Sequence, residues 1–321
     1  MLYNVYKDRV VKMLENTYFV KLKEKYNYND KVIKTIEKII PCLIDYYGHE
    51  YKYIILEAIL NTEIIACSSK QTISKIINEK KLTPLVGENL YDIDQKKGEC
   101  VYTPNIKLSY NEEINSYEID EIDRIIVTSH TFNYDSPKGI EVLTHALCHL
   151  VKSYKDEIMV HENKVTIRSG ISYEERKIIY GENLSLELVN DFGKALEEGF
   201  TILDTEQIVS MVLNDKYKCY DYESLYMIAL ILKEKYKLKR EINSFEMSGE
   251  ITSFKKKYKK EQIDKLATIC DDCVTIENDM HLSYTREDKD EIAKILKEKL
   301  EKEAFTELVS IYQNSKTKQK N

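Results

Sequence analysis

GIEVLTHALCHLV, residues 139–151, places two histidines four residues apart inside a run of apolar residues. Helical spacing is clear, because apolar side chains recur at i, i+3, i+7 and i+10 (Ile140, Leu143, Leu147 and Leu150), which predicts one core-facing stripe. His145 and His149 lie off that stripe, separated by about 40° of rotation and roughly 6 Å of rise. Both imidazoles can therefore reach one metal ion from the same face of the helix.

The residues before this helix support the same interpretation. Ser136 is a suitable N-cap, and Pro137 suits the first helical position. Residues 125–132, IIVTSHTF, read as a strand that leads directly into the helix. An apolar strand followed by an amphipathic helix favours a site enclosed by protein over a pair of histidines on an open surface.

The two histidines form a His-Ala-x-x-His frame that resembles the His-Glu-x-x-His motif of zinc metallopeptidases. Ala146 occupies the position of the general-base glutamate. Downstream, residues 195–201, ALEEGFT, resemble the Leu-Asn-Glu-Gly-x-Thr-Glu pattern of gluzincin-like bacterial proteins. In that family the glutamate before the glycine is the third zinc ligand, so the resemblance, which covers about residues 125–213, implies Glu198 beside His145 and His149.

This chain departs from the family pattern at three positions. Ala146 replaces the base, Glu197 replaces the usual asparagine, and Ile202 stands where an acid often orients a zinc histidine. Asp204 and Glu206 are nearby acids, but their spacing does not match that role. The loss of general acid–base help, typically worth about 10²–10⁴-fold, predicts a chain nearly inert as a peptidase.

The alanine admits two explanations. It is a deliberate Glu→Ala substitution that silences an active zinc peptidase, which we favour because the other parts of the site remain. Alternatively, the chain is a natural pseudopeptidase that acts as a metal-binding or protein-interaction module. A third reading, weaker than both, is a helical adaptor that binds no metal and in which the histidines are incidental.

We expect an α+β fold, predominantly helical, with three successive regions. Residues 1–95 form a helical N-terminal region, 96–213 a zincin-like metal-binding core, and 214–321 a helical C-terminal region. The zincin resemblance implies a deep cleft, and a peptide or protein substrate that binds as an added strand along an edge near residues 125–132.

The element predictions follow hydrophobic periodicity. Helices are expected over 32–40, with an interruption or kink at Pro41, from 53 toward 67, and over 69–77, 194–213, 222–236, 256–270 and about 292–308. Strands are expected over 99–110 and 116–128, and a hairpin over 157–170 with its turn at 161–164. Residues 172–180 read as a charged connector, and 183–190 are ambiguous.

Composition narrows the functional classes. The 321 residues carry a net charge of −7, which argues against nucleic acid as the main partner. Seven irregularly spaced cysteines indicate a reducing compartment, and the lone Cys270-x-x-Cys273 pair is interpreted as incidental. Without a signal peptide or a membrane-length apolar run, we expect a cytoplasmic protein with no membrane partner, export by another route remaining open.

The remaining candidates are side chains that could stabilise an oxyanion in a peptidase: His130, His161, Tyr173 and Tyr180. Each fits a surface or packing role better. The two other histidines, His49 and His281, are interpreted as surface or structural residues.

Overall fold

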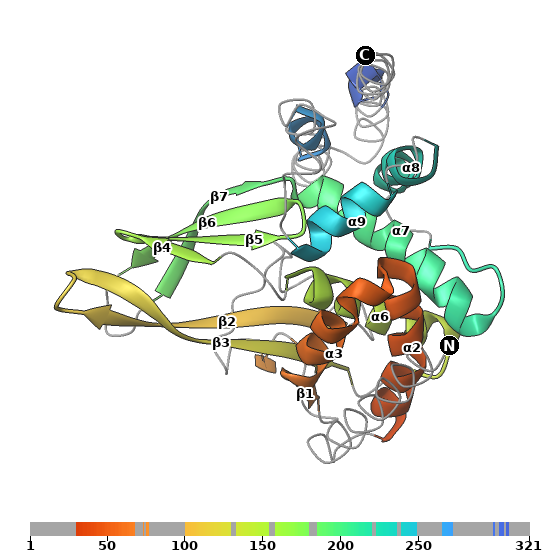
Figure 1. The fold of residues 1–321 in the computed structure, drawn as a ribbon, viewed down its shortest axis with the longest axis horizontal. Helices are drawn as coiled ribbons and strands as arrows, with labels where there is room; N and C mark the ends of the chain where they lie inside the picture. The colour runs from red at the N-terminus through yellow and green to blue at the C-terminus, as the bar shows by residue number, and fades with distance from the viewer. Residues whose placement is uncertain are drawn as a thin grey trace, which may run out of the picture. The chain divides into compact units, whose positions relative to one another are not determined.

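The computed structural model describes residues 30–67, 73, 75–76, 100–129, 133–153, 158–179, 185–219, 223–235, 239–248, 265–271, 298, 302–304 and 306–307. The fold is mixed α and β, rich in helix with two small sheets, which confirms the expected class at that level (Figure 1). The chain divides into two compact units. The first comprises 1–109, 119–154 and 205–218, and the second comprises 110–118, 155–204 and 219–321.

Three helices pack against one another in the first unit: α2 (Asp30–Tyr47), α3 (Lys52–Leu60) and α6 (Pro137–Ser153). A single 3₁₀ turn, η1 (His49–Tyr51), joins the first two. The predicted interruption at Pro41 is wrong, since α2 runs through it. Pro41 lies on the exposed face, where water can satisfy the carbonyl left without a partner.

Three strands form one sheet: β1 (Thr62–Ala66), β2 (Cys100–Asn111) and β3 (Ser116–Thr128). Their order across the sheet is β1-β3-β2. The predicted strands at 99–110 and 116–128 are confirmed. The helix predicted from residue 53 is confirmed as far as Leu60, where α3 ends. Its predicted continuation toward Cys67 is wrong, because β1 follows and pairs in parallel with β3, from Thr62↔Arg124 to Ala66↔Thr128. Ile65 packs against a small core that includes Ile125 and Val127, so long-range pairing overrides the local helical pattern.

The central position of β3 corrects a second expectation. A peptide was predicted to add to a sheet edge near residues 125–132, but β1 and β2 flank β3 on its two sides. Its backbone groups are therefore already used in the sheet. Residues 130–132 lie outside the part of the chain that the structure describes.

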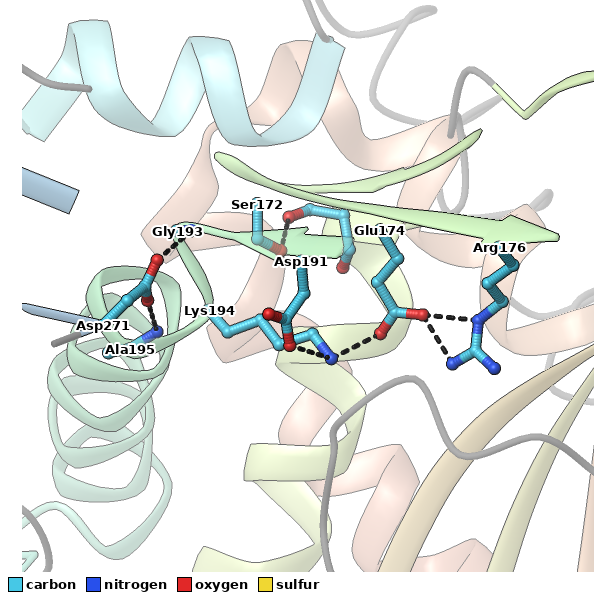
Figure 2. Close-up of polar contacts among 9 residues, drawn as sticks. Ser172, Glu174, Arg176, Asp191, Gly193, Lys194, Ala195 and Asp271 are labelled. Atoms are coloured by element: carbon cyan, nitrogen blue, oxygen red, sulfur yellow. Dashed lines mark hydrogen bonds and ion pairs between the residues drawn. The ribbon is translucent and has the colours of Figure 1, made fainter. Parts of the chain in front are cut away.

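The second unit contains an antiparallel sheet in the order β4-β5-β6-β7: β4 (Met159–His161), β5 (Lys164–Ser169), β6 (Ser172–Ile179) and β7 (Ser185–Phe192). The predicted hairpin is confirmed, with Val160 opposite Val165. The connector predicted over 172–180 is wrong, because β6 occupies it. Every second residue of β6 is buried, as expected for a strand. Two of these buried residues, Glu174 and Arg176, are charged and pair with each other (Figure 2). The sequence therefore lacks the alternation of apolar and polar residues by which a strand is predicted.

Helices complete the second unit. The first residues of α7 (Lys194–Leu213) pack with α8 (Glu223–Leu230), the π-helical turn η2 (Ile231–Lys235), α9 (Lys239–Ser248) and the helical residues 265–271. The predictions over 194–213 and 222–236 are confirmed, whereas α9 was not predicted. The helices predicted over 69–77, 256–270 and 292–308 lie largely outside the described residues, and those of their residues that the structure describes are helical.

Three fully buried charged side chains connect α7, η2 and α9. The Lys233 ammonium lies 2.6 Å from Asp204 Oδ1 and 2.9 Å from Glu246 Oε2, and 5.0 Å from the centroid of the Phe200 ring. Burial in a low-dielectric core makes these contacts depend on one another, because no single member can lose its partner without leaving a buried charge. Among the described residues, no helix is both long and apolar enough to cross a membrane.

Candidate metal centre

Helix α6 begins as its sequence predicts. The Ser136 hydroxyl oxygen accepts a hydrogen bond from Gly139 N at 3.1 Å, which satisfies one of the donors that a helix start leaves free. All four residues of the predicted core stripe are buried (Ile140, Leu143, Leu147 and Leu150). The predicted start of α6 and its predicted buried stripe are both confirmed.

His145 and His149 are both half-buried on α6. Their Nε2 atoms lie 3.1 Å apart, and their rings meet edge to face with centroids 4.7 Å apart. The expectation that the two imidazoles share one face is confirmed. Two zinc ligands at about 2.0–2.1 Å in tetrahedral geometry would lie roughly 3.3 Å from each other. The observed separation is close to that value.

Helix α7 approaches α6 further along its length. The Thr205 hydroxyl lies 4.0 Å from Cys148 Sγ, next to His149 in the sequence. Glu198 is seven residues before Thr205, so the two residues lie on nearly the same face of α7, about 10 Å apart along its axis.

Glu198 and the two histidines come together in the structure. One ligand atom from each of His145, His149 and Glu198 lies within 4.8 Å of the others. Two imidazole nitrogens and one carboxylate oxygen are a donor set that zinc accepts in catalytic sites, where a fourth position stays open. The residues present thus fit a zinc ion in number and in chemistry.

The neighbouring acid, Glu197, has a different role. It is buried, and its Oε2 accepts a hydrogen bond from Ile171 N at 2.8 Å, in the turn between β5 and β6. Gly170 in the same turn has a φ of +57°, and a Cβ there would overlap the Glu197 carboxylate. Glu197 therefore connects α7 to the turn of the sheet, a contact that no sequence pattern predicted. Because consecutive helical residues point about 100° apart, Glu197 and Glu198 face different directions.

Ala146 and the acids after Glu198 complete the comparison with the family pattern. Ala146 is only 2% exposed and offers no titratable group beside His145. Asp204 pairs with Lys233 at 2.6 Å, and this ion pair accounts for its burial. Glu206 is also buried, one turn beyond Ile202.

The other sequence candidates that the structure describes are not among the three residues of this cluster. His161 is exposed on β4, and the Tyr173 ring is exposed and stacks on Phe192 with centroids 5.3 Å apart. His49 is 79% exposed and lies 3.3 Å from Asp45, as expected of a surface residue. The Cys270 side chain is buried. Four candidates lie outside the described residues: His130, Tyr180, Cys273 and His281.

No protein-family model, curated protein or solved structure matches this chain. The chemistry assigned to the site therefore rests on its own residues.

Proposed function

We propose that this chain binds one zinc ion through His145, His149 and Glu198, in the ligand arrangement of a gluzincin-type peptidase that lacks its general base. The observation that supports the proposal is the convergence of three ligand atoms within 4.8 Å of one another. The order of elements supports it too. A strand precedes the helix with both histidines, and a later helix carries the glutamate, as in the zincin-like core proposed for residues 96–213.

A zinc ion at this site would lower the pKa of a bound water and polarise a substrate carbonyl. The chain's own contribution would be to orient the two imidazoles and the carboxylate from two rigid helices. Ala146 cannot accept a proton, so peptide hydrolysis should be slower by about 10²–10⁴-fold than with a glutamate there. The substrate class we propose, a peptide or protein, follows from the resemblance of the ligand frame.

Metal analysis of the purified protein tests the ligand set. We expect one zinc per chain for the protein with Ala146, and loss of stoichiometric zinc when His149→Ala is added. His161→Ala is the matched control, because it removes an exposed histidine outside the cluster and should leave zinc content unchanged. The proposal fails if the Ala146 protein holds no zinc, or if His149→Ala holds as much as the control.

Restoring the base separates a silenced peptidase from a natural pseudopeptidase. With zinc bound, Ala146→Glu should gain cleavage of a peptide library by about 10²–10⁴-fold, and adding His149→Ala should abolish that gain. Zinc-loaded Ala146→Glu without any cleavage would favour the pseudopeptidase, whose function would be metal or protein binding. The native codon at position 146 decides whether the alanine is natural.

A further inference from the structure

We propose that Asp271 is a positioning residue for the third metal ligand, because its carboxylate fixes the backbone at the start of the helix that carries Glu198. This inference rests on the metal site proposed above. Asp271 belongs to the Cys270-x-x-Cys273 segment, and no sequence pattern connects this segment with the ligand frame.

Both carboxylate oxygens of Asp271 bind the start of α7. Oδ2 accepts a hydrogen bond from Gly193 N at 2.6 Å, and Oδ1 accepts one from Ala195 N at 2.9 Å (Figure 2). A helix start leaves its first N–H groups without partners inside the helix. Gly193 has no side chain to cap them, so an aspartate 78 residues later in the chain supplies the acceptors. The negative charge also suits the positive end of the helix dipole.

Asp271 is itself held by apolar packing. Leu266, Ala267 and Cys270 are buried in one cluster with Ala195 and Leu196 of α7. Gly193 has a φ of +75°, a backbone conformation that favours glycine, and its backbone lies next to this segment, since a Cβ built there would be in ordinary contact with the Ala267 Cβ at 3.8 Å. The residues just before Asp271 are therefore packed against α7, which keeps the Asp271 carboxylate next to the start of that helix.

Further contacts hold the same turn through its side chains. Lys194 Nζ lies 2.7 Å from Glu174 Oε1 and 3.1 Å from Asp191 Oδ2, and Glu174 also pairs with Arg176 (Figure 2). Glu197 accepts from the Ile171 backbone, as described above. Asp271 differs from these residues because it holds the backbone of the turn. Its removal would let residues 193–195 fray, and Glu198 would have to be ordered at the moment of metal binding.

The test measures metal affinity and ligand geometry in the full-length chain. Zn²⁺ affinity is measured by competition with a chromophoric chelator, and Co²⁺ coordination by its visible spectrum. Asp271→Ala should weaken Zn²⁺ binding by about 10-fold or more, within the range of about 10–100-fold seen for residues that support metal ligands. Its Co²⁺ spectrum should shift toward that of Glu198→Ala. Asp271→Asn keeps one good acceptor and should lose less.

Asp215→Asn is the matched control. It removes the same charge from an exposed aspartate just beyond the other end of α7, and it should leave affinity and spectrum unchanged. Combination with Glu198→Ala tests whether the effect passes through that ligand, since Asp271→Ala should then cause no further loss. Circular dichroism of each variant reports folding, and the milder Asp271→Asn serves if Asp271→Ala does not fold.

The possible results are distinct. If the protein with Ala146 and no further substitution binds neither Zn²⁺ nor Co²⁺, the proposed function fails. If that protein binds metal and both Asp271 variants bind it equally well, the metal site stands and the positioning role is overturned. An equal loss in the Glu198→Ala background would also overturn it, because Asp271 would then act through general stability.

Discussion

Replacing Lys233 by methionine should destabilise the protein strongly, because the ammonium is the cation between two fully buried carboxylates. Lys233, Asp204 and Glu246 all have side chains with 0% exposure, at separations of 2.6 and 2.9 Å. Methionine keeps the apolar stem but leaves two buried negative charges. Breaking a buried ion pair by removing one partner typically costs about 3–5 kcal/mol. We therefore expect a loss in the free energy of unfolding of about that size.

Equilibrium urea unfolding measures this loss. With an m value of about 3 kcal/mol per M, the midpoint should fall by roughly 1–1.7 M. The matched control is Lys107→Met, whose ammonium lies at similar distances from two carboxylates, 2.7 Å from Glu121 and 3.0 Å from Asp123, but is 51% exposed. Exposed ion pairs contribute little to stability because solvent screens them, so the control midpoint should move little. The two variants share the substitution and the ion-pair distance and differ in burial.

A neutral triple variant checks the cause. Lys233→Met combined with Asp204→Asn and Glu246→Gln removes every charge of the cluster, and most of the lost stability should return. The reasoning is refuted if Lys233→Met and Lys107→Met lower stability equally, or if the triple variant is no more stable than Lys233→Met alone. Either result would mean that desolvation of the two carboxylates does not set the cost.

Two further outcomes follow from single contacts. Gly199→Ala should lower the free energy of unfolding by about 1–3 kcal/mol in urea, because a Cβ there would lie 2.6 Å from the Leu225 carbonyl oxygen of α8; an unchanged midpoint would contradict this close packing. The Lys107 ammonium donates hydrogen bonds to Glu121, which has the larger effect, and to Asp123, and these raise its pKa from 10.5 to about 12. Because the folded pKa is the higher one, the stabilisation is complete below about pH 10.5 and disappears as pH rises through about 12. NMR titration of the Lys107 side chain should show that midpoint, Glu121→Gln should lower it, and a midpoint at the ordinary value would refute the assignment.

Features set by local rules were predictable from the sequence. The cap at Ser136, the buried stripe of α6 and the shared face of His145 and His149 depend only on helix geometry and on residues within a few turns. The choice of Glu198 over Glu197 came from a resemblance. Helix geometry agrees with it, because neighbouring residues on α7 point in different directions and Glu197 is bound to the β5–β6 turn.

Other features depended on partners far away in the chain. The end of the second predicted helix became β1 because residues 62–66 pair with 124–128. Strand β6 was hidden because its buried face carries Glu174 and Arg176, which are compatible with burial only when they pair. Neither partner can be read from the local pattern of apolar residues.

The sequence by itself determined the helix with its two histidines and the missing base at Ala146, because side-chain identity and the helical period are local properties. Only the tertiary structure decided that Glu198 meets those histidines and that Asp271, 78 residues after Gly193, holds the helix that presents it. The physical reason is that a ligand set and a backbone cap are matters of distance. Distances between segments are set by how the whole chain packs, and no short stretch of sequence contains them.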